Sequence, residues 1–176
     1  MNITQNAQEK TIFILLMEYK THIPRLYQLL TAKKFTHAAI GIDNKYFFSF
    51  VIKGGFRSEK PWLFTNTKKK TKSCALYSLD VTDEVYNEIQ AHLAEFKASK
   101  KQYRYSFLGA LLCFLKIPHR FKNSYFCSQF VAELLSSSGA LELSKPPSLY
   151  HPHDFADEKN LSLCFQGSLD ELAMAV

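Results

Sequence analysis

Two hydrophobic periods alternate along the chain and predict a mixed α and β structure. Short apolar or alternating runs typical of strands cover residues 11–18, 35–42, 46–52, 74–81 and 161–165. Apolar positions at the spacing of one helix face occur over residues 22–34, 83–98, 105–117 and 124–138. Residues 1–10 are polar and typical of a loose tail, and no linker or repeat divides residues 11–176. We therefore expect one α+β domain behind a short tail.

Local signals refine these elements. Residues 43–45, Asp-Asn-Lys, suit a hairpin turn between two strands. Thr82 suits the N-cap of the helix that follows it. Residues 60–74 are polar and basic and indicate a surface loop. Residues 105–117 are apolar almost all round and lack the charged face of a membrane-surface helix, so we expect a buried core helix there.

Composition narrows the class of protein. The 176 residues are 47% hydrophobic and 14% aromatic, which excludes disordered and collagen-like chains. The formal net charge of +6 is compatible with an anionic partner. However, the basic run 68–72 is not interleaved with aromatic residues, so we expect a solvated loop and no nucleic-acid partner. No apolar stretch is long enough for a membrane span or a signal peptide, so we expect a cytoplasmic protein, with peripheral membrane contact still open.

The four cysteines contain no CxxC pair, and we interpret them as reduced thiols of which at most one does chemistry. Cys127 stands at the first turn of a helix whose apolar side begins at Phe130. Unpaired N–H groups and the helix dipole at that position favour the thiolate, which is the nucleophilic form. The same amides can hold an oxyanion. The alternative is a buried structural cysteine.

His37 lies in the apolar strand FTHAAIGI among small residues, where it can serve as a general base for a thiol. The alternative is a core histidine bonded to a backbone carbonyl. A third group must orient the imidazole. If residues 43–45 form a three-residue loop, Ala39 pairs with Ser49, which then shares a face with His37 and lies diagonally about 7 Å away. A two-residue turn reverses that parity.

A group of metal-ligand side chains, His151, His153 and Asp154, surrounds Pro152 near the C-terminus. No further clustered histidine or cysteine completes a site, so we interpret this segment as a surface turn. Gly54-Gly55 lacks the spacing of a phosphate-binding loop. We therefore expect neither a metal nor a cofactor.

The order of these segments resembles one enzyme family. The matching segments are FTHAAIGI, FFSFVIKGGF, YRYSFLGALL, YFCSQFVAELLSSSGAL and KPPSLYHPHDF, which together span roughly residues 11–172. They resemble a bacterial branch of the circularly permuted, papain-like NlpC-type cysteine hydrolases, the YiiX-like permuted amidases. In that permuted group the histidine precedes the cysteine, as His37 precedes Cys127 here.

The resemblance implies an antiparallel sheet carrying His37, packed against the helix that begins at Cys127. It implies that Cys127 is the nucleophile and His37 the base of an amide or ester hydrolase that works through an acyl-enzyme. Many relatives carry a carboxylate at the third position, where this chain has Ser49. We assign Tyr125 and Ser128, beside the thiol, to oxyanion or substrate binding.

The substrate implied by the family is less specific. A peptide, a cell-wall fragment or an acyl lipid all fit a thiol hydrolase. The alternative function is a catalytically weak or inactive papain-fold binding module, which the serine in place of a carboxylate favours.

Overall fold

A computed structural model of the chain describes residues 9–19, 28–29, 32–43, 45–60 and 71–175. Its main sheet is antiparallel and has the strand order β4-β3-β2-β1-β5-β8. These strands are β1 Lys10–Tyr19, β2 His37–Gly41, β3 Phe47–Val51, β4 Gly55–Glu59, β5 Thr71–Val81 and β8 Ser162–Gly167. A small parallel pair joins β6 Arg104–Tyr105 to β7 Ser124–Tyr125.

The helices are α2 Asp83–Ala98, α3 Phe107–Phe114, α4 Cys127–Ser137 and α5 Leu169–Ala175. Short 3-10 turns cover Lys100–Gln102, Pro147–Leu149 and Pro152–Asp157. None of the helices in the described ranges has the length and apolar character that crossing a membrane requires. The antiparallel sheet and these helices confirm the expected α+β class.

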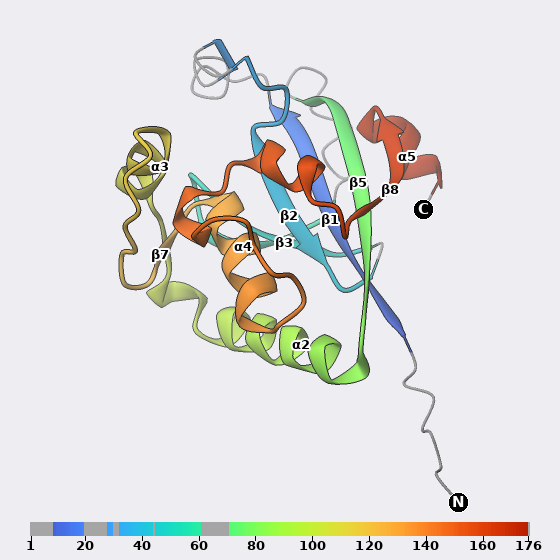
Figure 1. Cartoon of the computed structure of the whole chain (residues 1–176), viewed down its shortest axis with the longest axis horizontal. Helices are drawn as coiled ribbons and strands as arrows, with labels where there is room; N and C mark the ends of the chain where they lie inside the picture. Colours follow the sequence, from blue (N-terminus) through green and yellow to red (C-terminus); the bar gives the residue numbers. More distant parts are fainter. Residues whose placement is uncertain (1–8, 20–27, 30–31, 44, 61–70, 176) are drawn as a thin grey trace, which may run out of the picture.

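The sheet is covered on both faces, and β1 shows why. Alternate β1 residues such as Ile14 and Leu16 join the main core with α2 and α4. Their neighbours, Leu15 and Met17, pack instead with Leu172 of α5 in a smaller cluster. Successive strand residues point to opposite faces, so a dense apolar run such as TIFILLM serves two layers at once. Figure 1 shows α2 and α4 on one side of the sheet and α5 on the other.

The β2–β3 hairpin has the register expected for a three-residue loop. Ile40 pairs with Phe48 and Gly41 with Phe47. The Asp43 carboxylate accepts the backbone N–H groups of Lys45 and Tyr46 at 2.8 and 2.7 Å, which closes the turn.

Thr82 caps α2 as expected, because its hydroxyl oxygen accepts the N–H of Val85. Besides the short β6–β7 pair, two elements were missed. One is β4, which starts at Gly55 with φ +64°, where an added Cβ would lie 2.8 Å from the Tyr103 carbonyl oxygen. The other is α5. Most of the helix expected over residues 22–34 and most of the basic run 68–72 lie outside the described residues.

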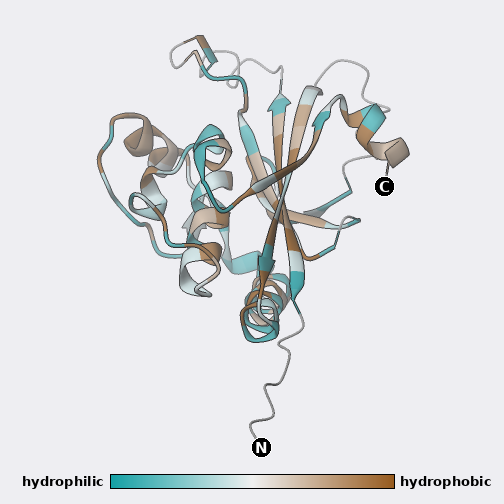
Figure 2. Ribbon diagram, turned by 45° about the vertical axis from the view of Figure 1, so that its right-hand side comes forward, coloured by the Kyte–Doolittle hydropathy of each residue, from teal (hydrophilic) through white to brown (hydrophobic). Residues whose placement is uncertain are grey.

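The expectation of a buried core helix over residues 105–117 is wrong. Only Gly109 and Cys113 of α3 are buried. Gly109 packs against Ser106 and Phe126, and Cys113 contacts Tyr150. Leu112 is partly buried, and most of the other large apolar side chains of this stretch are exposed: Phe107, Leu108, Leu111, Phe114, Leu115 and Ile117. Figure 2 shows α3 in hydrophobic colours at the edge of the molecule.

Candidate active site

Cys127 is the first residue of α4, and the extended Phe126 before it provides no capping side chain. The first N–H groups of the helix are therefore open to another acceptor. Backbone N–H groups of Ser128 and Ala38 hydrogen-bond the Cys127 sulfur. The thiol is thus held between the helix start and strand β2, with 6% of the residue exposed.

His37, the first residue of β2, forms a hydrogen bond with the Cys127 side chain. Burial alone would raise the pKa of the Cys127 thiol and lower that of the His37 imidazole. The hydrogen bond and the charge interaction between them outweigh burial, so the pKa of Cys127 is lowered and that of His37 is raised. The pair therefore favours thiolate and imidazolium more than the two isolated groups would.

Glu59 provides the third group of the site. Its Oε2 lies 3.4 Å from Nε2 of His37, and both side chains are almost fully buried. The carboxylate contributes to the raised pKa of His37. Neither atom has another hydrogen-bond partner among the described residues. The separation is long for a charge-assisted hydrogen bond.

Sheet curvature explains how Glu59 reaches His37. Glu59 pairs with Phe47, which pairs with Gly41. It is therefore two strands and four residues away from His37, roughly 16 Å between Cα atoms on a flat sheet. Strand twist brings diagonal corners of one face together, so these two long side chains meet although their strands are not neighbours.

Ser49 does not fill the position assigned to it. Although the hairpin register is the expected one, the Ser49 hydroxyl donates to the Ala38 carbonyl oxygen at 2.7 Å. Its hydrogen is therefore used on the β2 backbone next to His37. Ser49 secures the strand, and Glu59 takes the orienting position.

We expect Ser49→Ala to leave the reactivity of Cys127 almost unchanged while costing about 1 kcal/mol in the free energy of unfolding. The residue is completely buried, so removing the hydroxyl leaves a carbonyl with one donor fewer. Urea unfolding and Cys127 alkylation rates measure the two effects. A loss of alkylation as deep as that of a His37 variant would show that the serine has a direct role.

The two residues assigned to oxyanion or substrate binding also lie differently from expectation. The Tyr125 ring packs among Phe50 and Phe130, and its hydroxyl interacts with Arg120. We therefore assign Tyr125 to the core. The Ser128 hydroxyl donates to the Tyr150 carbonyl at 2.7 Å, so the Ser128 side chain anchors the following segment, and only its backbone N–H faces the thiol.

Two tyrosines not identified from the sequence lie near the thiol. Burial raises the pKa of Tyr19, and the charges of Glu59 and Cys127 raise it further. Burial and Cys127 likewise raise the pKa of Tyr105. The Tyr19 ring also meets the His37 ring edge-on, with centroids 5.1 Å apart. Both phenols remain protonated hydrogen-bond donors beside the Cys127–His37 pair.

The environments of the other thiols contrast with that of Cys127. Burial raises the pKa of Cys74 and of Cys113 to about 12, which keeps both protonated and poorly nucleophilic. Cys164 is exposed on β8, where its sulfur is 3.6 Å from the Ser162 carbonyl oxygen. Of the buried thiols, Cys127 alone has its pKa lowered.

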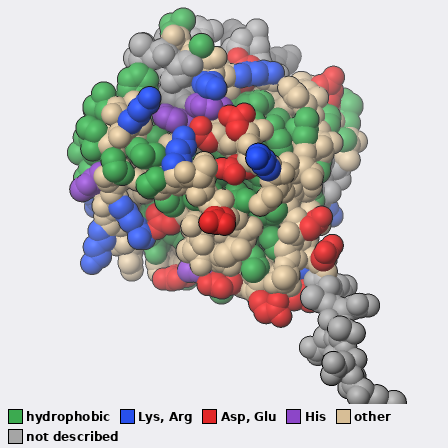
Figure 3. Space-filling model, viewed as in Figure 1, with side chains coloured by type: hydrophobic (Ala, Val, Ile, Leu, Met, Phe, Trp, Pro, Cys, Tyr) green, Lys and Arg blue, Asp and Glu red, His purple; other side chains and the backbone are tan. Residues whose placement is uncertain are grey.

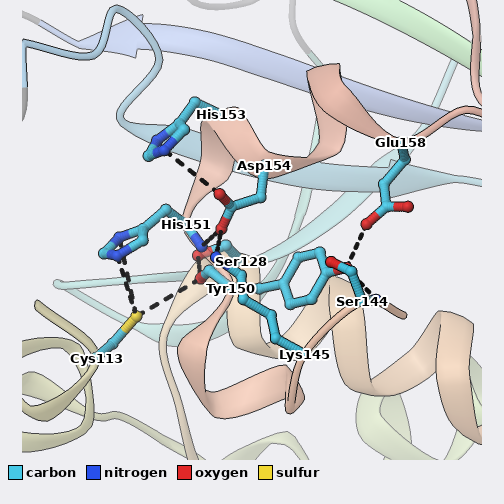
Figure 4. Close-up of polar contacts among 9 residues, drawn as sticks. All are labelled: Cys113, Ser128, Ser144, Lys145, Tyr150, His151, His153, Asp154 and Glu158. Carbon is cyan, nitrogen blue, oxygen red and sulfur yellow. Dashed lines mark hydrogen bonds and ion pairs between the residues drawn. The ribbon is translucent and has the colours of Figure 1, made fainter. Parts of the chain in front are cut away.

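The His151–Asp154 segment forms a polar cluster whose centre is a carboxylate (Figure 4). Asp154 accepts the backbone N–H of His151 and pairs with Lys145, each at 2.6 Å, while His153 lies 3.4 Å from it. Burial lowers the pKa of His151, and that of His153 to about 4. In the part of the chain that the structure describes, no three His, Cys, Asp or Glu side chains are grouped to hold a metal.

No known family model matches the sequence, and no curated protein shows significant similarity to it.

Proposed function

We propose that the protein is a cysteine hydrolase that cleaves acyl esters or amides. The observation that carries the proposal is the group of three buried side chains Cys127, His37 and Glu59, in which His37 interacts with both of the others. It combines a thiol of lowered pKa at a helix start, an imidazole of raised pKa and a carboxylate 3.4 Å from that imidazole. A nucleophile, a base and an orienting group in this order form the arrangement needed for covalent acyl transfer.

The reaction proceeds in two steps. Nε2 of His37 faces Glu59, so we assign the proton shared with the thiol to Nδ1. The Cys127 thiolate attacks the substrate carbonyl carbon, and a carbon–sulfur bond forms. His37 then gives its proton to the departing alkoxide or amine, which leaves an acyl-thioester. A water molecule, deprotonated by His37, attacks the thioester and releases the carboxylic acid and the free thiol.

The oxyanion of each tetrahedral intermediate needs hydrogen-bond donors. The backbone N–H of Cys127 at the α4 start is one, since the helix provides no earlier carbonyl to bond it. We propose the Tyr105 phenol as the second donor, because it is protonated and interacts electrostatically with Cys127. Tyr105 replaces Tyr125, whose hydroxyl interacts with Arg120.

The same site supports the proposed kinship with the circularly permuted papain-like hydrolases. The histidine is on a strand that precedes the cysteine-bearing helix in the chain, which is the permuted order. The family's carboxylate is supplied here by Glu59 of β4. A serine in place of a carboxylate favoured the alternative of an inactive binding module. The buried Glu59 carboxylate removes that reason.

Hydrolysis of 4-nitrophenyl octanoate tests the proposal. We expect wild-type protein to release 4-nitrophenolate, and intact-mass spectrometry after rapid acid quenching to show one octanoyl group on Cys127. Cys127→Ala should release none above background. Cys113→Ala is the matched control, because it removes a buried thiol of raised pKa and should leave the rate unchanged. Equal turnover by Cys127→Ala and wild type would refute the assignment.

A further inference from the structure

We propose that the α3 surface docks the protein on a bilayer that contains anionic lipids. The surface consists of five exposed apolar side chains: Phe107, Leu108, Leu111, Leu115 and Ile117. Each is about half exposed, and they lie on one short helix and the residues that follow it. Figure 3 shows hydrophobic side chains gathered over this edge of the molecule, with Lys and Arg beside them.

The positive charge around the α3 surface indicates which partner binds there. Residues 96–132 contain seven Lys or Arg and no Asp or Glu, which exceeds the net charge of +6 of the whole chain. Lys116 and Lys122 are exposed in the segment that follows α3. Arg120 is paired with Glu133, so it adds less. An apolar patch bordered by cations is complementary to lipid tails below a layer of anionic headgroups, whereas a second copy of the chain would bring the same positive charge against it.

A cavity of about 680 Å³ adjoins the same surface. Phe114 of α3 lines it together with Lys33, Lys116 and Lys145. Its carboxylate, Asp154, is already paired with Lys145 at 2.6 Å. Lys116 is a further cation of the lining and suits the phosphate of a lipid headgroup.

The patch is also tied to the thiol site. Tyr105, two residues before α3, lies in the electrostatic field of Cys127. At the other end of the helix, the Cys113 sulfur lies 3.9 Å from the Tyr150 carbonyl oxygen, which also accepts the Ser128 hydroxyl. Docking through α3 would therefore hold the site beside the lipid surface. Membrane binding itself does not depend on the proposed hydrolysis.

Vesicle co-sedimentation of the full chain tests the proposal. We expect binding to vesicles of phosphatidylcholine mixed with phosphatidylglycerol, weaker binding to phosphatidylcholine alone, and release by high salt. The double variant Leu111→Ser/Leu115→Ser should lower the partition coefficient about tenfold or more. Lys116→Gln/Lys122→Gln should lower it several-fold and reduce its salt dependence.

The matched control is Leu163→Ser, because Leu163 of β8 is as exposed as Leu111, 52% against 53%. This variant and Cys127→Ala should bind like wild type, so loss of hydrolysis and loss of docking are separate results. Absence of vesicle binding, or equal binding by Leu111→Ser/Leu115→Ser, would overturn the proposal. So would light scattering that shows a dimer which the same double variant dissociates, because the patch would then be covered by a second copy.

Discussion

His37→Ala should lower kcat/KM for 4-nitrophenyl octanoate by about 10²–10⁴-fold, the range expected for loss of a general acid–base group. The substitution also removes the hydrogen bond and the charge interaction that lower the pKa of Cys127. Only burial and the two backbone N–H groups would remain, and burial favours the neutral thiol. The fraction of thiolate at neutral pH should therefore fall together with the rate of acyl transfer.

His92→Ala is the matched control for this variant. His92 of α2 pairs at 3.8 Å with Glu88 on the same exposed helix face, and it should be dispensable for hydrolysis. Far-ultraviolet circular dichroism checks that both variants are folded. A folded His37→Ala protein that keeps wild-type kcat/KM would exclude the histidine as the base.

Glu59→Gln should lower kcat/KM by about tenfold or more, with the larger loss above pH 7, where hydrolysis declines through the pKa of His37. Glutamine keeps the size of the side chain but removes the negative charge 3.4 Å from His37. An opposite charge at such range moves a pKa by about 1–3. The pKa of His37 should fall, and a less basic imidazole holds less of the thiol proton. Solvent isotope and pH profiles of kcat/KM would show this shift, which a purely structural glutamate would not produce.

Glu133→Gln is the control for the second variant. Glu133 of α4 is partly buried and paired with Arg120, so it tests the removal of a paired acid outside the site. We expect its pH profile to match that of wild type. An unchanged profile for Glu59→Gln would assign the orienting role to another group.

Most elements could be predicted from the chain because their patterns are local. The residues of α2 follow from helical spacing and the Thr82 cap, and β1 follows from a dense apolar run. In contrast, β4 is only five residues long and shows two exposed polar positions, Arg57 and Ser58, in its centre. Its strand identity depends on pairing with β3, which no local pattern encodes.

The candidate site likewise contains residues that the sequence predicted and one that it did not. Cys127 at a helix start and His37 in a strand are visible as local anomalies, and the hairpin register followed from the loop length. Glu59 was missed because it reaches His37 across two strands by sheet twist. Only the pairing of β4 with β3 turns Glu59 toward the same face as Phe47. The exposure of α3 is likewise a tertiary property, because an all-round apolar helix is ordinarily buried.

The directions of the two pKa shifts imply different pH dependences for alkylation and hydrolysis. The lowered pKa of Cys127 places thiolate formation below the ordinary value of 9.0, so alkylation should rise there and then stay constant. Because the pKa of His37 is raised, its imidazolium stays protonated at pH values above 6.5, the ordinary histidine pKa. Hydrolysis needs that proton for the leaving group, so it should decline again at higher pH, through the raised pKa of His37.

The rate of iodoacetamide labelling of each cysteine against pH tests the central claim most directly. We expect Cys127 to react fastest of the four below pH 7 and to titrate below the ordinary thiol pKa of 9.0. Cys74 and Cys113, with pKa values raised to about 12, should stay nearly unlabelled. Faster labelling of any other cysteine below pH 7, or a Cys127 profile that rises only at the pKa of a free thiol, would contradict the Cys127–His37 pair.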